Sequence, residues 1–234
     1  MAPTTQSHTS TGTVATEKGS GSVIDRKPMV IGLYGLPGSG KSSLVNQMKL
    51  HVNHENFLFY EGSELISTIM TEGVAAFAKL NEKEKRQVRE QAINSVEKDC
   101  LTHNRTALVV GHYMFWPKDE MEGNVVATAS DFRVYTHIIY LDVTVPAMRE
   151  RRLRDTHRQR RPVSAAHLEQ WQQAEIDQLR RLCDPLSFTL KLVRHFERTN
   201  GSCNLALVAT KVKTALVADE RTETVLSMAL VKKC

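Results

Sequence analysis

The sequence predicts an α/β fold in which a five-stranded parallel sheet lies between layers of helices. Five short apolar runs with the composition of strands are separated by longer segments in which apolar residues recur at helical spacing. The first run leads directly into a glycine-rich turn that opens a helix. Because parallel strands need a crossover connection, usually a helix, this alternation indicates a sheet covered on both faces.

The predicted strands are short and rich in β-branched, leucine and aromatic residues. They occupy residues 30–34, 57–60, 106–111, 134–141 and 186–192. The last of them is predicted from its alternating leucine and phenylalanine residues.

Four helices are predicted between these strands. The first follows the glycine-rich turn and has apolar residues at helical spacing, namely Leu44, Val45, Met48 and Val52. Two more cover residues 64–80 and 82–102. The last begins after Ser164, a residue type that caps helices well, and is apolar along one face. The apolar residues of that face are Leu168, Trp171, Ala174, Leu179 and Leu182.

Length and composition describe an ordinary globular protein. The 234 residues are 41% hydrophobic and 24% charged. No apolar stretch approaches the roughly 20 residues that cross a bilayer. The four cysteines lie apart without a C-x-x-C pair, which argues against a disulfide framework or a cysteine-built metal site. We therefore expect a protein of the cytoplasm, a reducing compartment, that has no membrane partner.

Three regions are expected along the chain. Residues 1–27 include ten serine or threonine residues in the first 22 positions, and such a polar segment is predicted to be a disordered tail. Residues 28–195 contain every predicted strand and form the expected domain. Residues 196–234 are predicted to be a helical extension.

The excess positive charge is concentrated in one window. Residues 149–161 hold seven arginines and two acidic residues, which leaves 24 basic and 24 acidic residues out of the totals of 31 and 26. A nucleic-acid-binding face would spread its Lys and Arg widely, whereas clustered arginines suit compact anions such as phosphates. Nucleic acid is therefore not the expected partner.

The strongest motif is GLPGSGKS at residues 35–42, which matches the phosphate-binding consensus G-x-x-x-x-G-K-[ST]. It lies between a predicted strand and a predicted helix, the context that distinguishes a functional phosphate loop from a chance match. Its glycines allow backbone N–H groups to point at phosphate oxygens, and the helix start adds a positive dipole end. The residues expected to bind ATP are Gly35, Pro37, Gly38, Ser39, Gly40, Lys41, Ser42 and Ser43.

Two side chains of this loop have specific expected roles. Lys41 neutralises the β- and γ-phosphates during catalysis, and the Ser42 hydroxyl holds Mg²⁺. A guanine-reading N-K-x-D motif is absent, and the strand at residues 106–111 leads into Gly111-His112 instead of the acidic pair of motor ATPases. The expected class is therefore a small-molecule kinase that uses ATP and Mg²⁺, with the three-layer P-loop NTPase fold of the kinase type.

Two further features fit phosphoryl transfer. Glu61 follows the second predicted strand, and side chains just past the carboxyl ends of parallel strands face the binding crevice. It is expected to act as the general base for the attacking hydroxyl or to hold Mg²⁺ through water. The alternative is a solvated turn residue, which we favour for Glu64. The arginine window is expected to form a lid over the transferred phosphate, with Arg158 and Arg161 as catalytic residues, although some of its arginines are expected to be merely solvated.

These features together resemble P-loop kinases of the nucleoside and nucleotide monophosphate kinase class. More narrowly, the chain resembles the amino-terminal kinase-like module of certain fungal multidomain proteins, one of which is assigned as a nucleoside kinase in cordycepin biosynthesis. The stretches that carry the likeness are IGLYGLPGSGKSSL, FLFYEGSELIS, VVGHYMFW, HIIYLDVTVPAMRERRLRDTHRQRRPVS and LEQWQQAEIDQLRRLC. The resemblance implies ATP-dependent phosphorylation of a small hydroxylated acceptor, with a nucleoside as the expected one.

Those multidomain proteins continue into a phosphatase-like domain of the haloacid dehalogenase type and then a phosphoribosyltransferase-like domain. Residues 195–230 resemble the segment that leads into the phosphatase-like domain, but the Asp-x-Asp motif expected next does not follow. Residues 196–234 are therefore expected to be a remnant of that domain or a helix packed on the kinase core. Enzymes with phosphatase or phosphoribosyltransferase activity are the protein partners that the resemblance implies.

Two alternatives stay open. One is a nucleotide-binding regulatory module without catalysis, which the missing acidic residue at the end of the third predicted strand allows. The other is a polynucleotide 5′-hydroxyl kinase, which would need basic or aromatic residues beyond the arginine window to follow a strand.

Overall fold

The computed structural model describes residue 1 and residues 29–51, 55–155, 162–183 and 189–195. The predicted N-terminal tail, apart from residue 1, and the predicted C-terminal extension lie outside the described residues.

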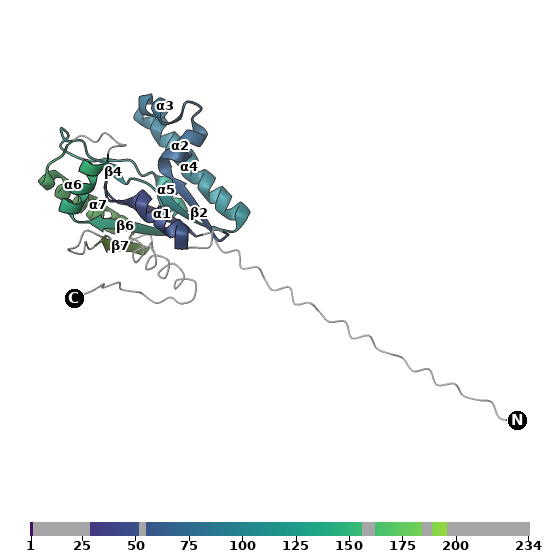
Figure 1. Ribbon diagram of the computed structural model, residues 1–234. Helices are drawn as coiled ribbons and strands as arrows, with labels where there is room; N and C mark the ends of the chain where they lie inside the picture. The colour runs from purple at the N-terminus through teal and green to yellow at the C-terminus, as the bar shows by residue number, and fades with distance from the viewer. Residues whose placement is uncertain (2–28, 52–54, 156–161, 184–188, 196–234) are drawn as a thin grey trace, which may run out of the picture.

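The centre of the fold is a parallel sheet with the strand order β2-β3-β1-β6-β7 (Figure 1). Its strands are Val30–Tyr34 (β1), Phe57–Glu61 (β2), Thr106–Val110 (β3), His137–Val143 (β6) and Thr189–His195 (β7). Every neighbouring pair of this sheet runs parallel, so the predicted α/β class with a parallel sheet is confirmed. A separate antiparallel pair joins β4 (Met114–Phe115) to β5 (Asn124–Val125).

Helices connect the strands of the sheet. They are α1 (Lys41–His51), α2 (Gly62–Ile69), α3 (Gly73–Lys79), α4 (Glu82–His103), α5 (Ala129–Val134), α6 (Val145–Arg154) and α7 (Ala165–Cys183). α2 contacts α3 and α4, and α6 contacts α7. Figure 1 shows these two groups apart from one another, with α1 between them. Among the described helices, none is both long and apolar enough to span a bilayer.

Burial explains why the loop after β1 is held firmly. All five residues of β1 are buried, whereas the edge strand β2 is half-buried along its length. On the other side of the loop, α1 places Leu44, Val45 and Met48 in the core. The glycine-rich turn is therefore anchored at both ends in packed apolar side chains, which limits its movement.

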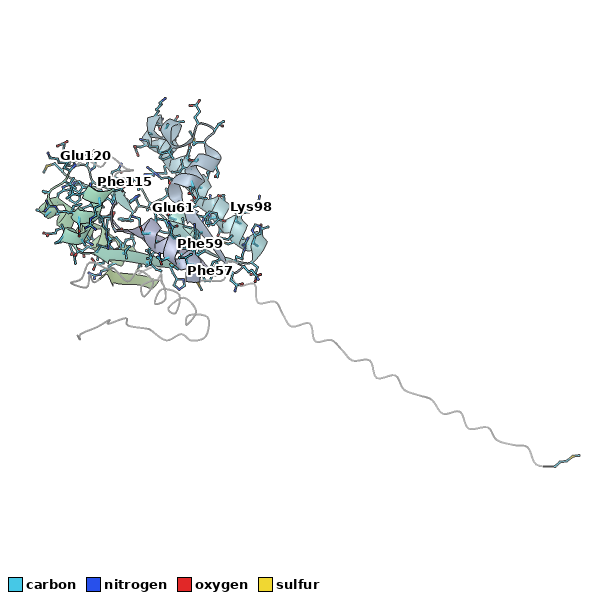
Figure 2. The ribbon with its side chains drawn as sticks, viewed as in Figure 1. Phe57, Phe59, Glu61, Lys98, Phe115 and Glu120 are labelled. Carbon is cyan, nitrogen blue, oxygen red and sulfur yellow. The ribbon has the colours of Figure 1, made fainter. Side chains whose placement is uncertain are left out.

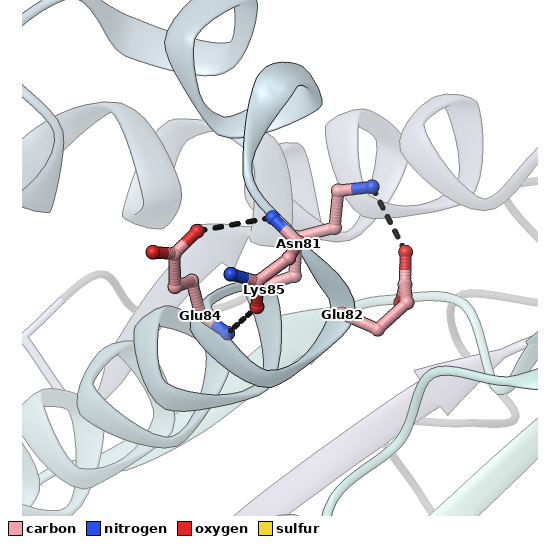
Figure 3. A network of polar contacts seen from close by, with 4 residues as sticks. All are labelled: Asn81, Glu82, Glu84 and Lys85. Carbon is pink, nitrogen blue, oxygen red and sulfur yellow. Dashed lines mark hydrogen bonds and ion pairs between the residues drawn. The ribbon is translucent and has the colours of Figure 1, made fainter.

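α4 begins with a capping box (Figure 3). The Glu84 N–H donates to the Asn81 side-chain oxygen at 3.0 Å, and the Asn81 N–H donates to the Glu84 carboxylate at 3.0 Å. Lys85 and Glu82 add an ion pair at 2.9 Å. The box satisfies N–H groups that a helix start leaves unbonded, and it defines where this helix begins.

The prediction of a single helix over residues 64–80 is wrong. The chain forms α2 and α3 with a turn at residues 70–72 between them. The Gly73 N–H donates to the Met70 carbonyl at 2.8 Å, and Gly73 takes a left-handed conformation with φ 67°. Glycine adopts this conformation easily, so Gly73 allows the chain to turn between the two helices. The apolar periodicity of the sequence continues across this turn and therefore does not indicate it.

The boundaries of two predicted strands are also corrected. The strand predicted at residues 134–141 begins at His137, because Thr128 and Asp131 form a capping box that starts α5, and α5 takes in Val134. The strand predicted at residues 186–192 is found as β7, which continues to His195, and residues 186–188 lie outside the described residues.

The helix predicted after Ser164 is confirmed. The His167 N–H donates to the Ser164 hydroxyl at 3.1 Å, and α7 begins at Ala165. Its buried face contains Leu168, Trp171 and Leu179 as predicted, but also the carboxylate of Glu175.

Candidate active site

The glycine-rich turn lies at the carboxyl end of β1, where the order of the strands reverses. The chain goes from β1 to β2 on one side of the sheet, and β6 lies on the other side of β1. Ligands of parallel α/β sheets bind outside the carboxyl ends of the strands at such a point. Because α1 begins at Lys41, the turn also ends at a helix N-terminus, which attracts anions.

Two glycines of the turn occupy positions that exclude a side chain. Gly35 has φ 142°, and a Cβ atom there would lie 3.0 Å from the Leu141 carbonyl oxygen. Gly40 has φ 95°, and a Cβ atom there would lie 3.1 Å from Arg151 Nη1. Other residues rarely adopt such φ angles, so the backbone geometry itself requires these glycines of the motif.

Lys41 is buried, with 6% of its surface exposed. Its ammonium group donates hydrogen bonds to the carbonyl oxygens of Gly35 at 2.5 Å and Leu36 at 3.2 Å. These bonds hold the positive charge at the turn, and Lys41 also lines a cavity that begins there. Because an ammonium group has three rotatable donors, it is able to exchange these carbonyls for phosphate oxygens.

The serines of the turn differ in their surroundings. Ser39 is buried, and its hydroxyl has no hydrogen-bond partner among the described residues. A buried hydroxyl without a partner costs free energy, and Ser39 is not among the residues that line the cavity. Ser42 is half-buried and Ser43 is exposed, and both line the cavity together with Pro37 and Gly38. These residues fit a triphosphate, and Ser42 is the one that would hold Mg²⁺.

Two arginines from α6 reach the turn. Arg151 Nη1 donates to the Ser39 carbonyl at 2.7 Å, and Arg152 Nη1 donates to the Pro37 carbonyl at 3.0 Å. Both side chains line the same cavity as Lys41. Three cationic groups therefore surround the loop that is expected to bind phosphates, as charge stabilisation in phosphoryl transfer requires.

The arginines singled out from the sequence are different members of the same window. Arg158 and Arg161 lie outside the described residues. Arg151 and Arg152 were not distinguished from their neighbours, because helical spacing alone does not say which turn of α6 meets the loop. The available signal is that α6 directly follows β6, the strand that pairs with β1.

A single cavity of ≈ 1200 Å³ extends from the turn to the group of helices α2, α3 and α4. Small-molecule sites usually have volumes of about 300–1,000 Å³. The cavity is therefore large enough for a nucleotide and a second small molecule side by side. Within the described residues, no group of three or more His, Cys, Asp or Glu side chains is arranged to hold a metal ion.

Glu61 is the last residue of β2 and lies opposite Val110 in the register with β3. Its side chain is half-buried and lines the cavity. Figure 2 labels Phe57, Phe59 and Glu61 in order along β2, and Phe115 lies beyond the same end of the sheet as Glu61. Glu64, one turn further on, is exposed and is not part of the cavity wall.

Glu175 is a charged residue that the sequence did not indicate. It is fully buried and lies on the packed face of α7. Its carboxylate accepts hydrogen bonds from the Tyr140 hydroxyl at 2.8 Å, the Trp171 indole N–H at 3.2 Å and the Met114 N–H at 3.2 Å. Through these bonds it joins α7 to β6 and to the segment after β3.

The environment of Glu175 favours its protonated form. Burial raises the pKa of Glu175 to about 7, although its hydrogen bonds and the positive charge of Lys41 act in the opposite direction. A carboxyl group at position 175 looks in the sequence like one polar residue of an amphipathic helix. A signal was available, since Leu168, Trp171, Glu175 and Leu179 recur at intervals of three and four residues.

The sequence matches the family model of the AAA domain over residues 34–169, which is more than half of the chain. The chain belongs to the AAA domain family. No curated protein matches this AAA domain protein. The matched residues run from the end of β1 to α7 and include the turn, Glu61, Arg151 and Arg152.

Solved structures resemble this AAA domain protein at low sequence identity. A shikimate kinase from Bacteroides thetaiotaomicron is similar with a TM-score of 0.52 and 13% identity, over 81% of this chain and 98% of that one. A thymidylate kinase from Ehrlichia chaffeensis has a TM-score of 0.44 and 12% identity, over 80% of this chain and 98% of that one. TT1252 from Thermus thermophilus has a TM-score of 0.44 and 12% identity, over 84% of this chain and 100% of that one.

The first of these likenesses identifies the fold of the AAA domain protein as a P-loop kinase-like fold. Together with the family, this confirms the prediction of a P-loop kinase-like protein. The narrower resemblance to fungal multidomain proteins stays a prediction.

Proposed function

We propose that this protein transfers the γ-phosphate of ATP to a hydroxyl group of a small molecule, with a nucleoside or a related compound as the acceptor class. The observation that carries the proposal is that one cavity joins the loop and Lys41 to the carboxylate of Glu61. Phosphoryl transfer needs cationic groups around the phosphates and a group that orients and deprotonates the nucleophile. The P-loop kinase-like fold supports the same reaction class.

Each group has one task in the proposed reaction. The acceptor oxygen attacks the γ-phosphorus, a new O–P bond forms, the bond to the bridging oxygen breaks, and ADP leaves. Glu61 takes the proton of the acceptor hydroxyl. Lys41 and the α6 arginines stabilise the negative charge on the phosphate oxygens. Mg²⁺, which Ser42 would hold, supplies further charge neutralisation when it is bound.

The test is phosphoryl transfer by the purified full chain. Labelled ATP with Mg²⁺ is offered with a panel of nucleosides, nucleotides, hydroxy acids and 5′-hydroxyl oligonucleotides. Lys41→Ala is expected to reduce turnover at least about 100-fold, because it removes a cation at the transferred phosphate. Lys98→Ala is the matched control, since Lys98 is exposed on α4 and does not line the cavity (Figure 2).

The outcomes separate the proposal from its alternatives. Transfer to a small hydroxylated compound that Lys41→Ala abolishes supports the proposal. Transfer to the oligonucleotides alone replaces it with a polynucleotide kinase. Tight ATP binding without transfer to any member of the panel replaces it with a regulatory module.

Glu61→Gln tests the role of the base. We expect turnover to fall by about 100-fold or more while the Kd for ATP stays within about twofold, because a glutamine fills the same space without accepting the proton. Glu64→Gln is the matched control at an exposed position outside the cavity. Equal turnover of the Glu61 variant and the wild type would remove Glu61 from this role.

A further inference from the structure

Glu175 is a buried carboxyl group beside the phosphate loop that no step above uses. Its partner Tyr140 lies opposite Tyr34 in the register of β6 with β1. Gly35 follows Tyr34 directly, and the Gly35 carbonyl accepts a hydrogen bond from the Lys41 ammonium group at 2.5 Å. Neighbouring strands therefore bring Glu175 and Lys41 into one region, where the positive charge of Lys41 acts on the carboxyl group.

The hydrogen-bond partners of Glu175 suit its ionised form. Oε1 accepts from the Met114 N–H and the Trp171 indole N–H, both at 3.2 Å, and Oε2 accepts from the Tyr140 hydroxyl at 2.8 Å. A backbone N–H and an indole N–H only donate. A proton on Glu175 would therefore have the Tyr140 oxygen alone as an acceptor among these three partners.

The burial of Glu175 works against its ionised form. Desolvation raises the pKa of Glu175 to about 7, although the hydrogen bonds and the charge of Lys41 act in the opposite direction. The carboxyl group is therefore balanced between its two forms near neutral pH. A change in the charge around Lys41 is enough to alter that balance, because charges interact strongly where water is excluded.

The other titratable groups around Glu175 come from β6 and from the segment after β3. On β6, Tyr140 bonds to Glu175, and Asp142 accepts a hydrogen bond from the Gln172 side chain of α7 at 2.9 Å. After β3, burial and the charge of Glu175 raise the pKa of Tyr113 to about 12. Both phenols therefore stay neutral near pH 7, which leaves Lys41 as the cation that stabilises the ionised Glu175.

We propose that Glu175 is a positioning residue of the nucleotide site, which offsets the charge of Lys41 in the empty loop and takes up a proton from solvent when Mg²⁺-ATP binds. The inference rests on the proposed binding of ATP and adds a proton to that step. Phosphate oxygens take the ammonium group of Lys41 for themselves, and they bring further negative charge to the region. The carboxylate then loses its compensating cation, and an O–H bond forms on Glu175 as the buffer gives up a proton.

The test counts protons during nucleotide binding to the full chain and does not depend on turnover. Calorimetry measures the enthalpy of Mg²⁺-ATP binding, without an acceptor, in buffers of different ionisation enthalpy between pH 6 and pH 9. The slope of the binding enthalpy against the buffer ionisation enthalpy is the number of protons taken up. Protons that belong to the nucleotide itself are common to all variants, so differences between variants report on the protein.

We expect the wild type to take up about 0.3–0.7 proton more than Glu175→Gln near pH 7.5. The Kd of the wild type for Mg²⁺-ATP should rise by about three- to tenfold between pH 6.5 and pH 8.5, since tenfold corresponds to a pKa change of one unit, and that of Glu175→Gln should rise less. Glu169→Gln is the matched control, because Glu169 is exposed on α7 and lies outside the cavity. A merely structural role would change the Kd of Glu175→Gln equally at every pH.

Tyr140→Phe tests the same inference with the carboxyl group intact. It keeps the ring and removes the hydrogen bond of 2.8 Å that favours the ionised form, so proton uptake should reach its maximum at a higher pH than in the wild type.

Two results would overturn the inference while the nucleotide still binds. They are equal proton uptake by the wild type and Glu175→Gln, and an unchanged pH profile of uptake in Tyr140→Phe. Failure of Mg²⁺-ATP to bind at all would overturn the proposed function and the inference together. The two failures are therefore distinguishable.

Discussion

Lys41 and Glu175 are both buried ionisable residues, and their hydrogen bonds have different effects on their charged forms. Two backbone carbonyls accept the hydrogen bonds of Lys41, so its charge is held at the loop. Glu175 accepts three hydrogen bonds, from a hydroxyl, an indole and a backbone N–H. Its pKa is nevertheless raised, because desolvation outweighs these bonds and the charge of Lys41.

Glu175→Gln is expected to flatten the dependence of stability on pH. The pKa of Glu175 rises from an ordinary value of 4.5 to about 7 in the folded protein. Between these pH values the folded state holds a proton that the unfolded state releases. The contribution of Glu175 to the free energy of unfolding is therefore greatest below pH 4.5 and is lost as the pH rises to about 7. The loss is of order 1–3 kcal/mol.

The measurement is the free energy of unfolding in urea between pH 5 and pH 8. The wild type should lose stability across this range by more than Glu175→Gln does. Glu169→Gln, an exposed change on the same helix, should leave the wild-type slope intact. Parallel slopes for the wild type and the Glu175 variant would contradict the raised pKa.

At the scale of elements, α6 connects the arginine window to the phosphate loop. The helix starts just after β6 and ends at Arg154, so the turn with Arg151 and Arg152 lies beside the loop carbonyls. These carbonyl groups accept hydrogen bonds from the two arginines, and the Ser39 N–H donates within the loop to the Leu36 carbonyl at 3.0 Å. The position of α6 thus fixes the carbonyl groups of a loop whose existence the sequence motif predicts.

Arg151→Met and Arg152→Met are expected to weaken the binding of Mg²⁺-ATP about tenfold each. Each change removes a charged hydrogen bond to the loop and a cation from the cavity wall. Calorimetric Kd values are the measurement. Arg149→Met is the control, because Arg149 is exposed and lies outside the cavity. Similar Kd values for all three variants would show that the α6 arginines do not act on the nucleotide.

For the whole molecule, the strand order determines where ligands meet. β1 lies between β3 and β6, and the carboxyl ends of β1, β2 and β3 open into one cavity through the loop, Glu61 and Gly111. Residues separated by 90 positions in the chain, such as Glu61 and Arg151, therefore line the same space.

Mg²⁺-ATP is expected to raise the melting temperature of the full chain. A ligand present at about 100 times its Kd stabilises the folded state by about 2.7 kcal/mol. In a protein of this size that corresponds to a rise of about 5–10 °C. The measurement is a thermal melt with and without the nucleotide, and the Lys41→Ala variant should show a much smaller shift. A full shift in that variant would place the nucleotide elsewhere.

Local patterns predicted much of this fold. The strand at residues 30–34, the phosphate loop, the start of α1 and the Ser164 cap all depend on neighbours within a few residues, and each is found where the sequence indicates. The break at residues 70–72 was missed because the apolar spacing continues across it. The start of the strand at His137 was missed because α5, which begins at the Thr128–Asp131 capping box, continues through Val134, a residue of high β-propensity.

The amino-acid order alone determined the layered α/β class, the loop that suits a triphosphate and the charge cluster that suits phosphates, because these follow from short-range periodicity and backbone conformation. Tertiary structure decided which arginines contact the loop. It also decided that Glu175 is buried where the charge of Lys41 acts on it, and that Arg89 lies beside apolar side chains. These depend on how distant segments pack, and burial and charge compensation are properties of that packing.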